Sequence, residues 1–191
     1  VMGRGDEAIR YALRAVELDP RANGAWSVLG WAYTTTGRLQ ESFAAYQRAL
    51  QLEPSDWWTN MNLAYTYYLP LGRHQEAIAS IDRALQADPE NQVVLSVAVG
   101  VYASAGRPAD GRRFLDSLLA QGRKGRWVDP WNLAEVYAWL GETDRALAYF
   151  SRLAGLTNSP EAYFNRAKAN SELKKIDDAK ADYRKAIKLR Q

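Results

Sequence analysis

The chain has 191 residues, which is enough for one domain with its own core or for a row of small repeated units. It contains no cysteine and a single histidine, which excludes disulfides, thiolate catalysis and cysteine-ligated zinc and leaves little for a histidine-based triad or metal site. The net charge of +3 comes from residues 160–191, because residues 1–159 hold 16 Lys and Arg against 17 Asp and Glu, and this argues against a basic stripe for nucleic acid.

The first segment, residues 1–22, has scattered charge and no apolar core after a basic start, so we expect no signal peptide. Its tripeptide Arg4–Gly5–Asp6 matches a cell-adhesion motif, but it aligns with the turn that follows Gly37. We therefore expect an ordinary turn and helix start there. The longest apolar stretch, which starts at Val93, is interrupted by serine and glycine before it reaches the about 18 residues of a membrane span.

Glycine, tyrosine, alanine and proline all recur along the chain with a period of 34 or 35 residues. The recurring residues are Gly3, Gly37, Gly72, Gly106 and Gly141, then Tyr33, Tyr67, Tyr102 and Tyr137, and the pairs Ala15–Pro20, Ala49–Pro54 and Ala84–Pro89. A period of this length indicates a repeat architecture, in which each unit buries its apolar face against its neighbours.

The clearest unit, residues 26–54, contains two stretches with helical spacing of apolar residues. A glycine, Gly37, suits the turn between them, and Pro54 suits the exit from the second helix. Small residues at Gly30, Ala45 and Ala49 predict a close approach of the two helices. The unit is therefore predicted to be an antiparallel helix pair.

The motif in this unit resembles the tetratricopeptide repeat family. It stands here as Trp26, Leu29–Gly30, Tyr33, Ser42, Tyr46, Ala49 and Pro54. The resemblance implies an all-α fold, a right-handed α-solenoid of antiparallel helix pairs with about eleven helices. We expect a single array made of the second helix of a truncated repeat and five repeats, at residues 1–22 and about 23–56, 57–91, 92–126, 127–159 and 160–191.

Several repeats depart from the motif. The second has one extra residue between Tyr67 and Gly72, and its Pro70 should bend or end the helix. The third is valine-rich and would suit a strand in isolation, but the repeat register predicts a helix. The last has Lys174 in place of the turn glycine and Asn170 in place of the tyrosine. With its lysine-rich composition, it indicates either a seam near residue 158 between segments of different ancestry or a polar terminal repeat.

The resemblance implies that the first helix of each repeat lines a concave groove, where partners bind as peptides or helices. The groove is predicted to be aromatic and poor in charge, and Trp31, Trp58, Tyr65 and Trp131 are expected to be exposed, whereas the four recurring tyrosines are expected in the core. The candidate binding residues are Trp31, Trp58, Met61, Asn62, Tyr65, Tyr68, Trp131, Asn132, Glu135, Trp139, Phe164 and Asn165.

Asparagines Asn62, Asn132 and Asn165 occupy the same position in their repeats, where an amide could pair with a peptide backbone. This is similar to part of the asparagine ladder in the repeats of glycosyltransferases that modify serine and threonine, although Val28 and Val97 interrupt it. The positions that resemble the family's carboxylate clamp for chaperone tails hold Ser27, Trp31, Asn62, Val93 and Val97 here, so we expect no such clamp.

No constellation of catalytic residues or metal ligands is present, so we expect a non-enzymatic scaffold without a cofactor, in the cytoplasm or the periplasm. Its expected partner is a protein or peptide segment, with no nucleic acid and no membrane insertion, and a homo-oligomer could form through open solenoid ends. The alternative is a regulatory or self-association module of a larger bacterial signalling or transcription-regulator protein. Residues 122–150 are similar to repeat tails of bacterial transcription regulators and adenylate cyclases.

Overall fold

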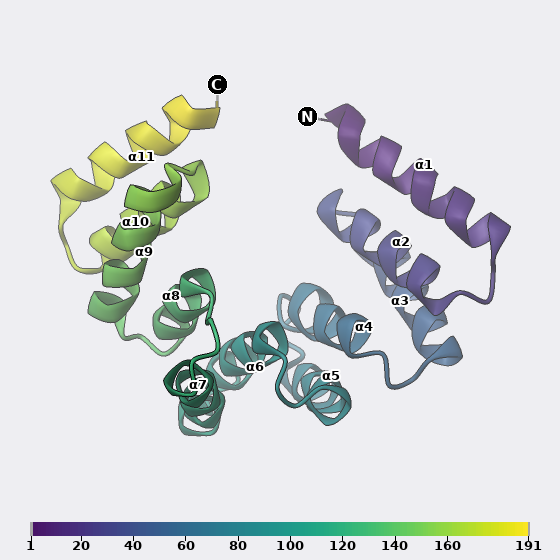
Figure 1. Cartoon of the computed structure of the whole chain (residues 1–191). Helices are drawn as coiled ribbons and strands as arrows, with labels where there is room; N and C mark the ends of the chain where they lie inside the picture. The colour runs from purple at the N-terminus through teal and green to yellow at the C-terminus, as the bar shows by residue number, and fades with distance from the viewer. Residues whose placement is uncertain (1, 191) are drawn as a thin grey trace. The chain divides into compact units, whose positions relative to one another are not determined.

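The structure is a computed structural model that describes residues 2–190, with side chains from residue 5 onward. Within these residues all regular secondary structure is helical, and successive helices are joined by short connections (Figure 1). The helices are α1 (Met2–Leu18), α2 (Asn23–Thr35), α3 (Leu39–Leu52), α4 (Trp57–Asn62), a π-helical segment η1 (Leu63–Tyr68), α5 (His74–Ala87), α6 (Gln92–Ser104), α7 (Pro108–Arg123), α8 (Pro130–Trp139), α9 (Thr143–Thr157), α10 (Pro160–Glu172) and α11 (Ile176–Arg190).

The contacts divide the chain into two compact units, residues 1–97 and 98–191, which are described separately below. The predicted all-α fold of helix pairs is confirmed, and the valine-rich stretch lies in α6 as predicted rather than in a strand. The expected turn at Arg4–Gly5–Asp6 is wrong, because α1 already begins at Met2. None of the helices within residues 2–190 is long and apolar enough to cross a membrane.

The core of the first unit is built by close contact between the helices of each pair. The ring of Tyr46 on α3 is fully buried over Gly30 of α2, where an added Cβ would lie only 2.6 Å from the ring. Ala45 and Ala49 are also buried, so the small residues do allow the predicted close approach. The recurring tyrosines Tyr67, Tyr102 and Tyr137 are buried as expected, whereas Tyr33 is only partly buried.

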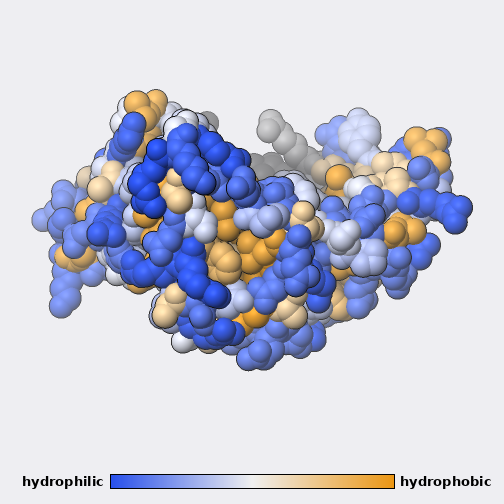
Figure 2. Space-filling view, turned by 60° about the horizontal axis from the view of Figure 1, so that its bottom comes forward, coloured by the Kyte–Doolittle hydropathy of each residue, from blue (hydrophilic) through white to orange (hydrophobic). Residues whose placement is uncertain are grey.

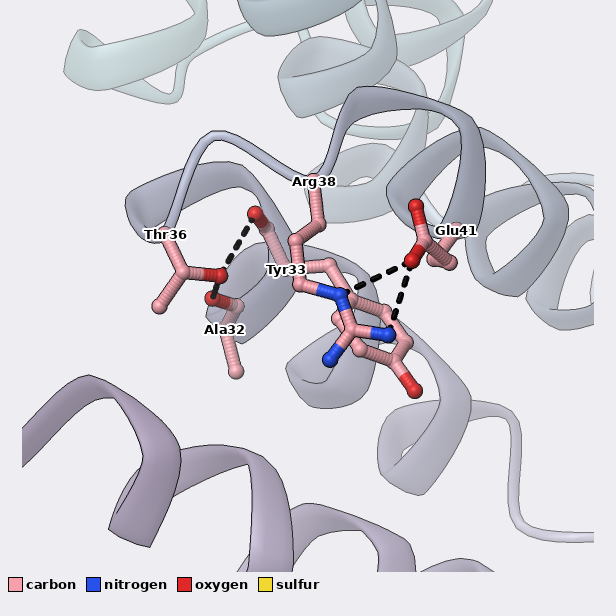
Figure 3. A network of polar contacts seen from close by, with 5 residues as sticks. All are labelled: Ala32, Tyr33, Thr36, Arg38 and Glu41. Atoms are coloured by element: carbon pink, nitrogen blue, oxygen red, sulfur yellow. Dashed lines mark hydrogen bonds and ion pairs between the residues drawn. The ribbon is translucent and has the colours of Figure 1, made fainter.

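The turn between α2 and α3 is fixed by a polar network (Figure 3). The Arg38 guanidinium lies 4.7 Å from the centre of the Tyr33 ring and pairs with Glu41 at 2.7 Å. This pairing raises the pKa of Arg38 and lowers that of Glu41. The Thr36 hydroxyl donates to the carbonyl oxygens of Ala32 and Tyr33, and the Arg38 backbone N–H also donates to the Tyr33 carbonyl, at 2.9 Å.

The same turn recurs with small variations. Arg73 lies over Tyr68 and Arg107 over Tyr102, and each pairs with an acid three residues later. The four turn glycines have positive φ, with values from 66° at Gly72 to 76° at Gly37. In the last turn Lys174 takes this left-handed conformation at φ 58°, which costs a residue with a Cβ about 1 kcal/mol.

The extra residue of the second repeat is absorbed by η1. The Leu69 amide donates to the carbonyl of Ala64, five residues earlier, at 3.0 Å, which is the hydrogen bond of a π-helix. The extra residue places two tyrosines side by side: Tyr67 stacks on Phe43 with ring centres 4.3 Å apart, and Tyr68 lies under Arg73. Helical structure ends before Pro70, consistent with the predicted effect of that proline.

Candidate peptide-binding surface

Charge is segregated between the two kinds of helix in the first unit. The first helices of the pairs, α2 and α4 with η1, contain no Asp, Glu, Lys, Arg or His, and neither does α6. The second helices α1, α3 and α5 carry the charged residues of this unit together with the turns and connections. A partner that approaches the first helices would therefore meet an uncharged surface.

Three large apolar side chains are exposed on α2, α4 and η1. Val28 is 54% exposed, Trp31 47% and Tyr65 42%. Trp31 and Tyr65 hold the same position in consecutive repeats, and their helices are joined by a buried hydrogen bond between the hydroxyls of Ser27 and Thr59. We call Val28, Trp31 and Tyr65 the aromatic row. Figure 2 shows that hydrophobic residues on the visible face lie in patches between hydrophilic ones.

Two predicted binding residues of the first unit are buried instead. Met61 is 7% and Asn62 6% exposed. The Asn62 amide nitrogen donates to the carbonyl oxygen of Trp58 at 2.8 Å, so its donor is used within its own helix. Met61 and Asn62 therefore present little surface to a partner, and their role in binding stays a prediction.

Trp58 and Tyr68 are partly buried, and both pack against the core cluster formed by Tyr46, Leu63 and Tyr67. The extra residue in η1 gives Tyr68 the place under the turn arginine that Tyr33 and Tyr102 have in their repeats, and a role of Tyr68 in the groove stays a prediction. The wide π-turn could not be read from the sequence, although the extra residue that causes it could.

In the second unit the predicted binding residues divide in a similar way. The Trp139 indole packs on Gly100, where an added Cβ would lie 2.7 Å from the ring, but it is only partly buried, so its place in the groove stays a prediction. Trp131 is partly buried and meets the Phe150 ring edge-on, with centres 6.0 Å apart. Phe164 is 45% exposed. Asn132 and Asn165, like Trp131, keep partial exposure.

Glu135 holds the position in its repeat that Trp31 and Tyr65 hold in theirs. Burial raises the pKa of this carboxyl, and the nearby Asp129 raises it further, while a hydrogen bond with the Trp131 side chain acts in the opposite direction. The second unit therefore presents a partly desolvated acid beside an indole, which differs from the uncharged row of the first unit.

A polar pair in the last repeat was not anticipated from the sequence. Arg166 donates to both carboxylate oxygens of Asp182, at 2.8 and 2.5 Å, and Asn170 donates to the same carboxylate at 3.2 Å. The carboxylate raises the pKa of Arg166. In the first full repeat the equivalent positions are the apolar Leu29 and Ala45. Comparison of the last repeat with the first full repeat in the sequence could have revealed this replacement.

A cavity of about 430 Å³ lies beside this pair, between α9, α10 and α11. Ser151 and Lys175 contribute to its lining. Asn170 stands where the preceding repeat has Tyr137, whose ring stacks on Tyr149, and the shorter side chain leaves this space open. We assign no ligand to it.

Family models described as tetratricopeptide repeat match residues 1–56, 71–129, 131–155 and 160–191. The small glutamine-rich tetratricopeptide repeat-containing protein 2 of Mycosarcoma maydis is 40% identical over 55 residues. The match covers 29% of this chain and only 16% of that protein.

Solved structures of other proteins have a similar fold over most of this chain. TTC0263, a tetratricopeptide repeat protein of Thermus thermophilus, is 25% identical with a TM-score of 0.70, over 88% of this chain and 91% of that one. YrrB, described as having an unusual peptide-binding site, is 18% identical with a TM-score of 0.55, over 93% and 91% of the two chains. At 18% identity the second likeness concerns the fold alone.

Proposed function

Because the chain belongs to the tetratricopeptide repeat family, whose members generally act as non-enzymatic protein–protein interaction scaffolds, we propose that its first helices bind a peptide or helical segment of a partner protein. The observation that carries this proposal is the aromatic row. A tryptophan and a tyrosine at the same repeat position are both more than 40% exposed, on neighbouring helices that lack charge.

Exposed aromatic rings on a rigid helical surface are effective anchors, because they bury a large area and lose little side-chain entropy. Loss of such an anchor from an interface commonly costs about 2 kcal/mol or more, or about thirtyfold in affinity. The partner segment should therefore present aliphatic or aromatic side chains to Trp31 and Tyr65.

The second unit would select a different part of a partner. The residues at the repeat position of Trp31 are Glu135 on α8 and the exposed Lys168 on α10. Phe164, four residues before Lys168 on α10, is also exposed. A segment bound there should combine an apolar side chain with polar groups. The peptide-binding site ascribed to YrrB, which shares the fold, is compatible with such a role.

This function can be tested by selection from a displayed random-peptide library on the intact chain. We expect selected peptides to share aliphatic or aromatic residues and to bind the first unit with an affinity that changes less than about threefold when the salt concentration is raised from low to physiological. Exposed charges are largely screened over this range, whereas apolar contacts are not. A steep loss of affinity with salt would contradict the proposal.

The second candidate function is self-association. The observation that favours it is the exposure of apolar residues on α1 and α11, with Tyr11 and Leu18 each 70% exposed and Ile187 61%. Light scattering over a concentration series distinguishes the two functions. A mass that rises with concentration, and a rise that Tyr11→Ala/Leu18→Ala abolishes, would favour self-association.

A further inference from the structure

The connection between α7 and α8 exposes a tryptophan next to a group of cations. Trp127 is 72% exposed, and Arg123, Lys124 and Arg126 precede it within four residues. No acidic residue occurs between Asp116 and Asp129. This segment belongs to the second unit and lies outside the surface formed by the first helices.

The end of α9 has the same combination of side chains. Leu156 is 72% exposed, and the exposed Arg152 lies four residues earlier, on the same side of the helix. Because α7 and α9 are both second helices of their pairs, the geometry of a regular repeat stack runs them in the same direction, with their C-terminal ends at one edge. We call the six residues Arg123, Lys124, Arg126, Trp127, Arg152 and Leu156 the basic edge.

Three charges of the basic edge, those of Arg123, Lys124 and Arg152, are available to a partner. Arg123, Lys124 and Arg152 form no ion pair with any residue of the described chain, 2–190, and their side chains are exposed. Cations at a helix C-terminus also favour the helix dipole, which is a structural reason for Arg123 and Lys124. That reason accounts neither for an exposed indole in the connection nor for Leu156 at the end of the next second helix.

We propose that the basic edge docks on an anionic membrane surface, with Trp127 and Leu156 entering the interfacial region and the cations contacting lipid phosphates. Tryptophan favours the boundary between headgroups and hydrocarbon, and each nearby Lys or Arg contributes to attraction by anionic lipid. A wide, flat surface can meet two protruding apolar side chains on separate elements at once. An acidic protein segment would satisfy the cations but gives no reason for two separate exposed anchors.

Vesicle binding tests this proposal, which is independent of the proposed peptide binding. The intact chain should co-sediment at low salt with vesicles of equal parts phosphatidylcholine and phosphatidylglycerol and not with phosphatidylcholine alone. Physiological salt should weaken this binding. Arg123→Gln/Lys124→Gln should weaken it by about 30-fold, because each cation near the surface adds to the attraction. Trp127→Ala should also weaken it.

Matched controls use exposed residues of the first unit. Arg10→Gln/Arg21→Gln removes the same charge and Trp31→Ala removes another exposed indole, and both should bind vesicles as the parent does. Thermal unfolding of each variant checks that the fold is kept. The proposal is overturned if no vesicle binds, if the controls lose as much affinity as the basic-edge variants, or if polyglutamate binds the edge while vesicles do not.

Discussion

A single close contact, that of Gly30 with Tyr46, sets the spacing of the first helix pair. The ring occupies the place that a side chain at residue 30 would need, and burial raises the pKa of its hydroxyl. This hydroxyl makes no hydrogen bond of normal geometry within the described chain, although the hydroxyls of Thr34, Ser42 and Thr66 are close enough to influence it. Apolar packing of the ring is therefore what holds Tyr46 in place.

The substitution Gly30→Ala should lower the free energy of unfolding by about 1–3 kcal/mol, because the new methyl group overlaps a fully buried ring. Gly24→Ala in the same helix is the control, since a Cβ there meets nothing within 4 Å, and it should raise stability by about 0.4–1 kcal/mol rather than lower it. Urea unfolding followed by circular dichroism measures both. Equal effects of the two substitutions would contradict this account of the contact.

At Glu135 the raised pKa predicts a pH-dependent stability. The folded state holds the proton more tightly than the unfolded state, so stability falls as pH rises from the unfolded pKa of about 4.3 through the raised folded pKa. Glu135→Gln should therefore unfold at a higher temperature than the parent at pH 7, and this advantage should vanish below about pH 4. A constant difference across this range would show that the charge is not responsible.

At the scale of the helix, the sequence predicted which segments are helical better than it predicted which residues of a helix face the neighbouring helices. Its period of 34 or 35 residues correctly indicated helix pairs, even in the valine-rich α6, because several residue types agreed. It also located the extra residue before Gly72. The choice between a wider helical turn and a longer loop depends on tertiary packing, however, and that choice decides whether Tyr67 or Tyr68 lies under Arg73.

Deletion of Tyr68 should turn η1 into a regular α-helix, since Tyr67 would then stand four residues before Gly72, as the tyrosines of the other repeats do. We expect unchanged helical circular dichroism and cooperative thermal unfolding at a somewhat lower temperature, because one ring is lost from the cluster. Deletion of Ala79 in α5 is the control, because it rotates the following residues by about 100° and exposes Ile81. Loss of cooperativity in both variants would exclude this view of η1.

The pair Arg166–Asp182 joins α10 and α11 through a carboxylate that is 7% exposed. Asp182→Ala should destabilise the chain by about 2–4 kcal/mol, since it leaves a partly buried guanidinium uncompensated. Arg166→Leu/Asp182→Ala restores the residue types of Leu29 and Ala45 and should recover most of this loss. A double variant less stable than Asp182→Ala, measured by urea unfolding, would mean that the pair itself stabilises these helices.

At the scale of the whole molecule, the distribution of charge was readable from the sequence and the exposure of single rings was not. The absence of Asp, Glu, Lys, Arg and His from α2, α4 and η1 follows from the sequence once the repeat register is known. Which rings are exposed depends on neighbours. Trp139 finds a glycine to pack on, Trp58 meets a cluster of tyrosines, and only Trp31 and Tyr65 remain more than 40% exposed among the predicted tryptophans and tyrosines.

The most direct test of peptide recognition is the affinity of a library-selected peptide for the parent chain and for Trp31→Ala/Tyr65→Ala, measured by isothermal titration calorimetry. We expect the double variant to bind at least thirtyfold more weakly while keeping the parent's unfolding temperature, because both rings are exposed anchors rather than core residues. Tyr11→Ala/Leu18→Ala, which removes exposed apolar side chains from α1, should leave the affinity unchanged. An unchanged affinity in the Trp31→Ala/Tyr65→Ala variant would contradict binding through the aromatic row.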